Sequence, residues 1–338
     1  MILKKAYNMF FKLKNELTLA ISTSGHGGME AVMCNLLEPG DKVLITVNGI
    51  WGERASLMAS RYGAQVCRIE APLGSNFSLQ EIEDALIKHQ PSLLFVVQGE
   101  SSTGVYQPIE GIGRICHKYN CLLAVDTVAS LGGVPFYADR WEVDVVYSGS
   151  QKVLGAPPGL APISFNKKAQ QRIFSRKTPV KVFYWDMTIL GDYWACFGNP
   201  RVYHHTISST LLYGLREGLA LIAEEGLENV INRHRMCALR LHNGLRDLGL
   251  EFLVEKESAR LPTVNTIKVP TDVDWKTVTS YAMKYYFLEI SGGLGPTVNK
   301  VFRIGLMGYN ATNDKVDFAL KILKEALEYA RENKSSKL

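Results

Sequence analysis

Short apolar runs alternate with segments of helical hydrophobic spacing along the first half of the chain. The runs are nearly continuous in Val, Ile and Leu, which is typical of parallel strands buried between two helical layers. Strands are predicted at residues 17–21, 42–47, 64–69, 92–97, 121–126 and 143–147. Helices are predicted at residues 29–37, 53–62, 79–89 and 109–119. The order predicts an α/β fold with a mostly parallel sheet of the seven-stranded type, sandwiched by helices.

The second half of the chain predicts a further strand, long helices and a smaller α/β unit. Residues 160–165 predict an antiparallel strand, and the aromatic-rich residues 172–199 predict an irregular segment. Long amphipathic helices are expected at residues 210–225 and 227–248. The smaller unit is expected to contain strands 251–254, 263–269 and 302–305 and helices 275–286 and 314–332. The break at Glu225-Gly226 divides the chain into a large domain, residues 1–225, and a C-terminal domain, residues 226–338.

Composition narrows the class of protein. The chain has 338 residues, 21% of them charged, and its net charge of +5 is too small and too scattered to indicate a nucleic-acid partner. No apolar run reaches the roughly 18 residues of a membrane span, and residues 1–14 are expected to form a surface helix. The six cysteines form no Cys-x-x-Cys pair and predict reduced, buried thiols without a metal site.

An acid and an amine close two neighbouring predicted strands. Asp126 ends one strand, and Lys152 follows the next strand after the small, polar turn Ser148-Gly-Ser-Gln. Such a pair could serve a pyridine-type cofactor, because the acid would keep the ring nitrogen protonated while the amine forms a Schiff base with an aldehyde. That division of labour is the one pyridoxal phosphate (PLP) requires. The alternative is a turn aspartate and a solvated loop lysine.

Three further groups follow predicted strands directly. The glycine-rich turn at Gly25-His26 precedes a helix and could bind a phosphate, although its glycine spacing is neither that of a dinucleotide site nor that of a P-loop. Trp51 could offer a flat face to a cofactor ring or serve as a core anchor, and Ser101 lies in a run of hydroxyl residues. Open α/β sheets bind ligands at the carboxyl ends of their strands, where all of these groups are expected to meet.

Polar residues in the second half add two candidates. Arg303 stands inside the apolar strand Val301-Phe-Arg-Ile, where it could bind a carboxylate or form a structural salt bridge. His204 and His205 are adjacent and point in different directions on any regular element, so hydrogen bonding is expected of them rather than a shared metal.

Motifs across nearly the whole chain occur in the order of one family. They are Ser22-Thr-Ser-Gly-His26, Asn48-Gly-Ile-Trp51-Gly, Gly99-Glu-Ser-Ser-Thr-Gly104, Val125-Asp126, Ser148-Gly-Ser-Gln-Lys152, Ala156-Pro-Pro-Gly159, Arg201-Val-Tyr-His-His-Thr206, Gly292-Gly-Leu-Gly-Pro296 and Arg303-Ile-Gly. With them the chain resembles the alanine–glyoxylate and serine–pyruvate aminotransferases, a class V branch of the fold-type I PLP enzymes.

The resemblance implies a role for each candidate residue. Lys152 would carry PLP and move the substrate proton, and Asp126 would pair with the pyridinium nitrogen. The remaining ring and substrate contacts would come from Trp51 and Val128 on the two ring faces, Ser101 near the polar edge of the ring, and Arg303 on the substrate carboxylate. The phosphate would be held by Ser24, Gly25, His26 and Gln151, joined by Tyr203 and Thr206 of the other subunit of a homodimer.

The resemblance also implies a reaction, and the end of the chain separately predicts a location in the cell. The amino group of L-alanine or L-serine would pass to glyoxylate or pyruvate with ping-pong kinetics. A 3-hydroxykynurenine transaminase of the same branch is the alternative. The C-terminal Ser336-Lys337-Leu338 is a peroxisomal targeting tripeptide, which predicts a peroxisomal location, an import receptor as partner and a role in glyoxylate removal.

One departure from the family pattern leaves another possibility. Family members begin with a segment that carries a Gly-Pro-Gly-Pro motif and wraps the partner subunit, whereas this chain starts at Met1 close to its first strand. A non-catalytic form that pairs with full-length subunits is therefore a further hypothesis. A cysteine desulfurase lacks its Cys at a suitable place before the C-terminal domain, and a nicotinamide dehydrogenase lacks its glycine pattern.

Overall fold

The structure is a computed structural model that describes residues 13–335. Most of the helix predicted at residues 1–14, and the whole tripeptide Ser336-Lys337-Leu338, lie outside this range. At the centre is a seven-stranded sheet in the order β1-β9-β8-β7-β4-β2-β3. Its strands are β1 (Leu17–Ile21), β2 (Lys42–Val47), β3 (Gln65–Glu70), β4 (Leu93–Val97), β7 (Leu122–Asp126), β8 (Val145–Tyr147) and β9 (Ala161–Phe165).

Strand direction is nearly uniform across this sheet. The pairs from β3 to β8 are parallel, and β9 pairs antiparallel with both β8 and β1, so β9 alone runs against the other strands of the sheet. The predicted α/β fold, the mostly parallel sheet and the antiparallel strand near residue 160 are confirmed. The carboxyl ends of the other strands therefore gather at one edge.

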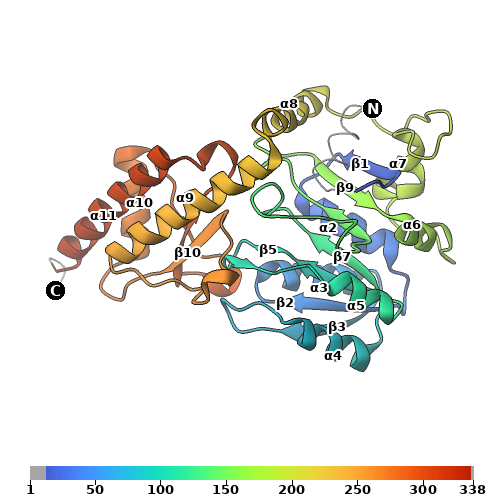
Figure 1. Ribbon diagram of the computed structural model, residues 1–338, viewed down its shortest axis with the longest axis horizontal. Coiled ribbons are helices and arrows are strands. Elements are labelled where there is room, and N and C mark those ends of the chain that lie inside the picture. The colour runs from blue at the N-terminus through green and yellow to red at the C-terminus, as the bar shows by residue number, and fades with distance from the viewer. Residues whose placement is uncertain (1–12, 336–338) are drawn as a thin grey trace.

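Alternate apolar side chains of each strand point to opposite faces of the sheet and form two hydrophobic layers, as β4 illustrates. Phe95 packs into one hydrophobic cluster and Leu94 and Val96 into the other. Helices α2 (Gly25–Leu36), α3 (Ile50–Arg61), α6 (Lys167–Phe174) and α7 (Met187–Tyr193) cover the first face. Helices α4 (Leu79–His89), α5 (Ile112–Lys118) and α8 (Ser209–Glu225) cover the second (Figure 1).

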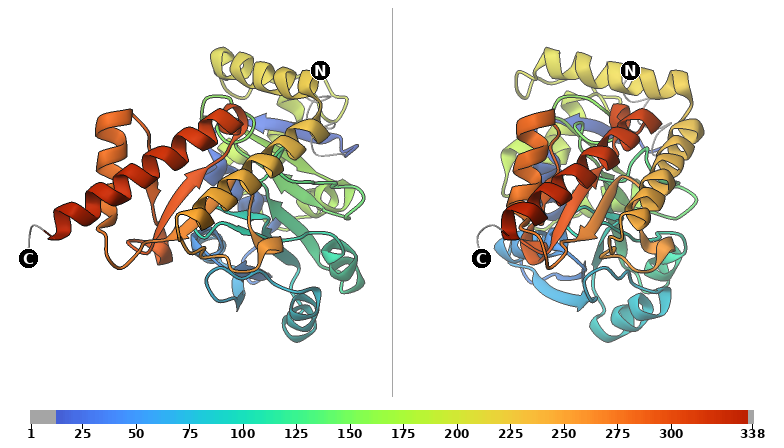
Figure 2. Two further views of the ribbon diagram at one scale, coloured as in Figure 1. Left: turned by 60° about the vertical axis from the view of Figure 1, so that its left-hand side comes forward. Right: turned by 90° about the vertical axis from the view of Figure 1, so that its left-hand side faces the viewer.

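A smaller sheet lies in the C-terminal part of the chain. Its order is β10-β12-β11, with β10 (Val264–Lys268), β12 (Val301–Gly305) and β11 (Ser291–Gly292). Helices α9 (Leu227–Asp247), α10 (Trp275–Tyr286) and α11 (Asn313–Ser335) pack with it around a hydrophobic cluster of its own. Figures 1 and 2 show this unit beside the large sheet, with α9 leading into it. The domain boundary at residue 226 stays a prediction.

Several predicted elements were wrong. Residues 172–199 contain the end of α6, the short helix η1 (Phe183–Trp185) and α7, whose first turn is capped by the Asp186 carboxylate accepting from Thr188 N at 2.9 Å. Residues 251–254 form no strand, because only Phe252 bridges to Ile267. Helices α2 and α3 begin earlier than predicted, since their first turns contain glycines that weaken the helical pattern.

Short elements complete the description. They are β5 (Gly99–Glu100), β6 (Val105–Tyr106), η2 (Glu257–Ala259), η3 (Gly295–Thr297) and η4 (Gly308–Asn310). Within residues 13–335, no helix is long and apolar enough to cross a membrane. All six cysteines are free thiols, and all but the half-buried Cys67 are buried, which confirms the predicted burial of the other five.

A histidine and two acids join elements at the edge of the sheet opposite the strand carboxyl ends. The fully buried Asp144 carboxylate accepts hydrogen bonds from Leu123 N at 2.7 Å and Asn166 Nδ2 at 2.7 Å, and it contacts His117 Nε2 at 3.0 Å. His117 Nδ1 lies 2.9 Å from Glu142 Oε2. The neighbouring Asp144 carboxylate, with a smaller effect of Glu142, raises the pKa of His117 against the opposing effect of burial.

This arrangement makes stability depend on pH. Because its pKa is raised in the folded state, His117 stabilises the fold fully below its ordinary pKa of 6.5. This stabilisation is lost as the pH rises through the raised pKa. We expect His117→Gln to lower the free energy of unfolding by about 1.5–3 kcal/mol near pH 6, the range for hydrogen bonds to charged groups, and by less near pH 9. Urea denaturation at both pH values measures this, with His89→Gln at the end of α4 as control. Equal losses at both pH values would contradict the assignment.

Candidate active site

A cavity opens at the edge where the parallel strands end. The empty space between its walls, including the part that opens to solvent, is about 560 Å³. The residues that line it are Ser24, Gly25, His26, Met29, Trp51, Gly99, Ser101, Asp126, Val128, Ala129, Gln151 and Lys152. Nine of the residues predicted from sequence are among them, so the structure brings together the groups that follow β1, β2, β4, β7 and β8.

Asp126 stands at the carboxyl end of β7, where its side chain is almost fully buried. One carboxylate oxygen accepts from Val128 N at 2.8 Å, and the other accepts a short hydrogen bond from the Tyr147 hydroxyl. Burial raises the pKa of Asp126 to about 6, while the hydrogen bonds from Tyr147 and Val128 act to lower it. A protonated ring nitrogen beside this carboxylate would further favour its ionised form.

The Lys152 amine is held in the cavity without a polar partner among residues 13–335. The loop is fixed just before it at Ser150, whose N donates to Leu160 O at 3.0 Å and whose Oγ donates to Pro157 O at 2.6 Å. Burial lowers the pKa of Lys152, and the positive charge of Arg303 lowers it further. Because its pKa is lowered, a larger fraction of Lys152 carries the neutral amine, which is the nucleophilic form.

An open helix start forms a third part of the cavity. Ser24 precedes α2 without capping it, and the N–H groups of Gly25, His26 and Gly27 donate to no atom of residues 13–335. Such a helix N-terminus favours an anion. Residue 25 must be glycine at this close approach, because a Cβ there would lie 2.8 Å from Val128 Cγ2.

The Gln151 side chain also lines the cavity. Its buried Oε1 has no hydrogen-bond partner among residues 13–335. A glutamine amide can rotate to present its NH₂ group instead, and this edge could then donate to an anion.

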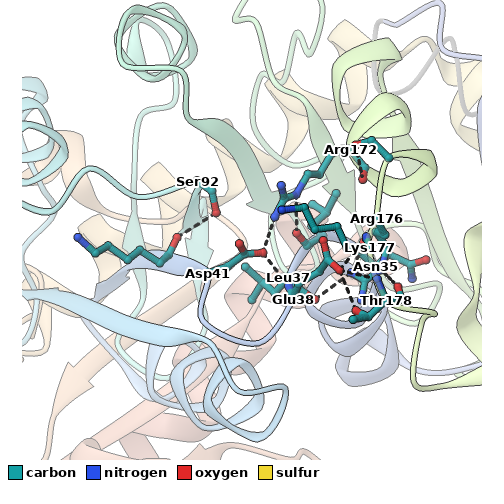
Figure 3. Close-up of polar contacts among 12 residues, drawn as sticks. Asn35, Leu37, Glu38, Asp41, Ser92, Arg172, Arg176, Lys177 and Thr178 are labelled. Carbon is teal, nitrogen blue, oxygen red and sulfur yellow. Dashed lines mark hydrogen bonds and ion pairs between the residues drawn. The ribbon is translucent and has the colours of Figure 1, made fainter.

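The far end of α2 is fixed by arginines (Figure 3). Arg176 Nη1 donates to Asn35 O and to Leu37 O, both at 2.9 Å. Arg172 Nε donates to Leu36 O at 3.3 Å, and its guanidinium also forms an ion pair with Asp41. Two cations thus satisfy the C-terminal carbonyls of the helix whose N-terminus faces the cavity, which opposes movement of that helix along its axis.

Trp51 lies in the first turn of α3, with its ring at the cavity wall. Its Nε1 donates to Ser101 Oγ at 2.8 Å, and its ring meets the His26 ring edge-on with centroids 5.1 Å apart. Both contacts fix the plane of the indole, so that a flat ligand could stack on it.

Arg303 lies beside the cavity without lining it. Its Nε donates to Gly292 O at 2.7 Å and its Nη1 to Ser101 O at 3.1 Å. Nη2 donates to none of residues 13–335, and Arg303 forms no ion pair within that range. The structure therefore gives no acid for the predicted salt-bridge alternative and leaves one donor edge available to a ligand.

Tyr203 and Thr206 do not join the cavity within one chain. They line a separate depression with Arg201 and His205, and their hydroxyl oxygens lie 2.9 Å apart. Tyr203 is 73% exposed. The neighbouring histidines bond to each other at 2.8 Å, and His205 Nε2 lies 2.7 Å from Ser22 Oγ, as expected of hydrogen-bonding residues.

Sequence reasoning missed four residues around the cavity. Met29, Gly99 and Ala129 line it, and Tyr147 bonds to Asp126. The signal for Tyr147 is the strand register, which pairs it with Asp126 across β7 and β8. No motif in the sequence reveals that register.

Comparison with known proteins places the chain in a family. The family described as Aminotransferase class-V matches residues 3–318. The chain belongs to the class-V aminotransferases. This aminotransferase is 56% identical to "Alanine--glyoxylate aminotransferase" of Drosophila melanogaster, over 97% of its own length and 84% of the relative. PLP is its cofactor, as in other enzymes of this family and fold.

Solved structures agree with this assignment of the class-V aminotransferase. An alanine–glyoxylate aminotransferase from Nostoc sp. superposes with a TM-score of 0.93 at 44% identity, covering 96% of this chain and 85% of the other. A ureidoglycine–glyoxylate aminotransferase from Bacillus subtilis superposes with a TM-score of 0.94 at 34% identity, covering 97% and 84%.

The cavity fits PLP on its own chemistry. It offers a buried carboxylate for the ring nitrogen, an amine without a partner for the aldehyde, and unsatisfied N–H groups at a helix start for the phosphate. The buried amide oxygen of Gln151, which also lines the cavity, has no partner among residues 13–335, as expected of a site that a ligand completes.

Proposed function

We propose that this aminotransferase moves the amino group of L-alanine, or of L-serine, to glyoxylate, or to pyruvate, in a ping-pong sequence. The observation that carries the proposal is the meeting of the unpartnered Lys152 amine and the buried Asp126 carboxylate in one cavity with an open helix start. When bound, PLP supplies an electron sink for the charge that develops at the substrate Cα.

Each residue contributes one physical task. Lys152 would attach the cofactor through Nζ, then take the proton from the substrate Cα and return it. Asp126 would keep its negative charge beside the ring nitrogen, with Tyr147 and Val128 N holding the carboxylate in place. Trp51 and Val128 would bound the ring from its two faces, and Ser101 would lie near its polar edge.

Binding tasks fall to the remaining residues. Ser24, Gly25, His26 and Gln151 would hold the phosphate at the start of α2. Arg303 would anchor the substrate carboxylate through its unused Nη2 edge, which fixes the orientation of the bonds at Cα.

The names of the relatives support glyoxylate as the acceptor. The fly and Nostoc relatives are named for alanine and glyoxylate, and the Bacillus subtilis relative for ureidoglycine and glyoxylate. Their donors differ while their acceptor is the same. A 3-hydroxykynurenine transaminase remains the alternative, because the motifs around residues 151–158 and 183–185 are expected in both groups.

Absorbance spectroscopy tests the reaction. Purified protein with added PLP should develop a visible band, L-alanine should bleach it, and glyoxylate should restore it, because each half-reaction changes the ring. Lys152→Ala should show none of these changes. A wild-type band that neither L-alanine nor L-serine bleaches, but that 3-hydroxykynurenine does, would favour the alternative. Absence of any band at saturating PLP would contradict the proposed function.

A homodimer with shared active sites belongs to the same proposal. Tyr203 and Thr206 line a depression separate from the cavity of their own chain, next to Arg201 and His205. This polar group suits a phosphate, and we propose that it completes the phosphate site of the other subunit.

Mixed subunits test this sharing. Lys152→Ala and the double variant Tyr203→Phe/Thr206→Ala should each lose most activity when alone. Coexpressed, they should recover about a quarter of wild-type activity, since random pairing makes half the dimers hybrid, each with one complete site. No recovery in an isolated hybrid would show that Tyr203 and Thr206 serve their own subunit.

We further propose a peroxisomal location, which the tripeptide Ser336-Lys337-Leu338 supports through recognition by an import receptor. A fluorescent protein that carries residues 327–338 at its C-terminus should collect in peroxisomes, and the same fusion without Leu338 should stay diffuse. A diffuse signal from the intact fusion would argue against this location and against a peroxisomal role in glyoxylate removal.

A further inference from the structure

The turn at residues 100–103 binds two parts of the structure at once, and we call it the connector. Its side chains meet the segment that joins β2 to α3. Glu100 Oε2 accepts from Trp51 N at 3.1 Å, and Ser102 Oγ accepts from Ile50 N at 3.1 Å. Thr103 Oγ1 donates to Asn48 O at 3.2 Å. The first N–H groups of α3 are thus capped by the connector and not by the preceding Gly49.

The main chain of the connector faces the C-terminal unit. The carbonyl oxygens of three consecutive residues each accept one hydrogen bond from it. The donors are Arg303 Nη1 to Ser101 O at 3.1 Å, Thr297 Oγ1 to Ser102 O at 2.9 Å, and Thr266 Oγ1 to Thr103 O at 2.6 Å. The connector therefore lies between Trp51 on one side and Arg303 on the other.

Glu100 is the charged residue of the connector, and it is fully buried. Besides Trp51 N, its carboxylate accepts from Ser102 N at 2.9 Å and from Ser102 Oγ at 2.6 Å. The space around it is closed, because a Cβ on Gly49 would lie 2.3 Å from Glu100 Cδ. Glycine at position 49 lets the carboxylate reach the start of α3.

Charges on neighbouring elements act on this carboxyl group. Burial raises the pKa of Glu100 to about 7, and the negative charge of Asp126 on β7 adds to the rise. The hydrogen bonds from Ser102 and Trp51 oppose it. Burial lowers the pKa of Arg303 on β12, and the negative charge of Glu100 opposes this effect although the two side chains form no ion pair.

We infer that Glu100 is a positioning residue for transamination, which holds the Trp51 ring and the Arg303 guanidinium in one fixed relation. The inference rests on the proposed function, in which Trp51 bounds the cofactor ring and Arg303 anchors the substrate carboxylate. The bond that breaks at Cα must stand perpendicular to that ring, and its direction is set by both contacts together. Loosening the start of α3 would change one contact relative to the other.

Glu100→Gln tests the inference, because glutamine keeps the shape of the side chain but has one acceptor oxygen. It cannot accept from Trp51 N and Ser102 N at once. We expect PLP affinity to fall about tenfold, the effect of losing one hydrogen bond to a charged group. The visible circular dichroism of bound PLP should weaken, and the KM for L-alanine should rise about tenfold, because the Trp51 ring shifts relative to the Arg303 anchor.

Asp144→Asn is the matched control. It removes another fully buried carboxylate, at the opposite edge of the sheet, and should lower stability without changing PLP affinity, the dichroic band or KM. If Glu100→Gln loses stability as Asp144→Asn does but keeps the wild-type values of all three quantities, Glu100 is only structural and the inference is overturned.

A milder variant keeps the test open if Glu100→Gln does not fold. Ser102→Ala removes one donor to Glu100 and the acceptor of Ile50 N, and should weaken PLP binding severalfold with the same loss of dichroism. Unchanged PLP binding and dichroism in this variant would overturn the inference. A wild type that forms no PLP band, in contrast, contradicts the proposed function itself.

Discussion

The common direction of the strands is the constraint on which the site depends. Apolar side chains on both faces bury the sheet between helices, so the polar side chains that could bind a ligand lie beyond the ends of the strands. Because β1, β2, β4, β7 and β8 run the same way, the residues that follow them meet at one edge. The antiparallel β9 separates β1 from β8 in the sheet without changing the direction of either.

Buried ionisable groups are the cost of this arrangement. Asp126 and Glu100 have raised pKa values and Lys152 a lowered one, chiefly because burial disfavours their charges. Such groups weaken a folded protein unless something pairs with them. Glu100 and Asp126 accept hydrogen bonds from protein donors, whereas the Lys152 amine has no hydrogen-bond partner among residues 13–335. That difference separates a group held in place from one kept available for chemistry.

The sequence predicted the sheet well and the site in part. Strands such as β4 have buried residues on both faces, so apolar runs of five or six residues revealed them without any knowledge of the fold. Residues that follow strands, such as Asp126 and Lys152, could be placed at the same edge by direction alone. Helix α7 could not be found, because it is short and depends on the Asp186 cap and on packing against the sheet.

Two features of the site could not be predicted from any pattern in the sequence. The bond from Tyr147 to Asp126 needs the register of β7 and β8, and the contact between Ser101 and Arg303 joins residues that are 202 positions apart. Tyr203 and Thr206 were predicted from the resemblance alone. Within one chain the structure leaves them apart from the cavity.

The two sides of the connector differ in how far their contacts depend on the identity of its residues. Toward the C-terminal unit it offers carbonyl oxygens, which every amino acid possesses, so exchange of its side chains leaves those three acceptors in place. Toward α3 it offers a carboxylate and hydroxyls that few residues can supply. A substitution at Thr266 or Thr297 therefore leaves the contacts of the connector with α3 intact, whereas the side chains of the connector can change only together with the start of α3.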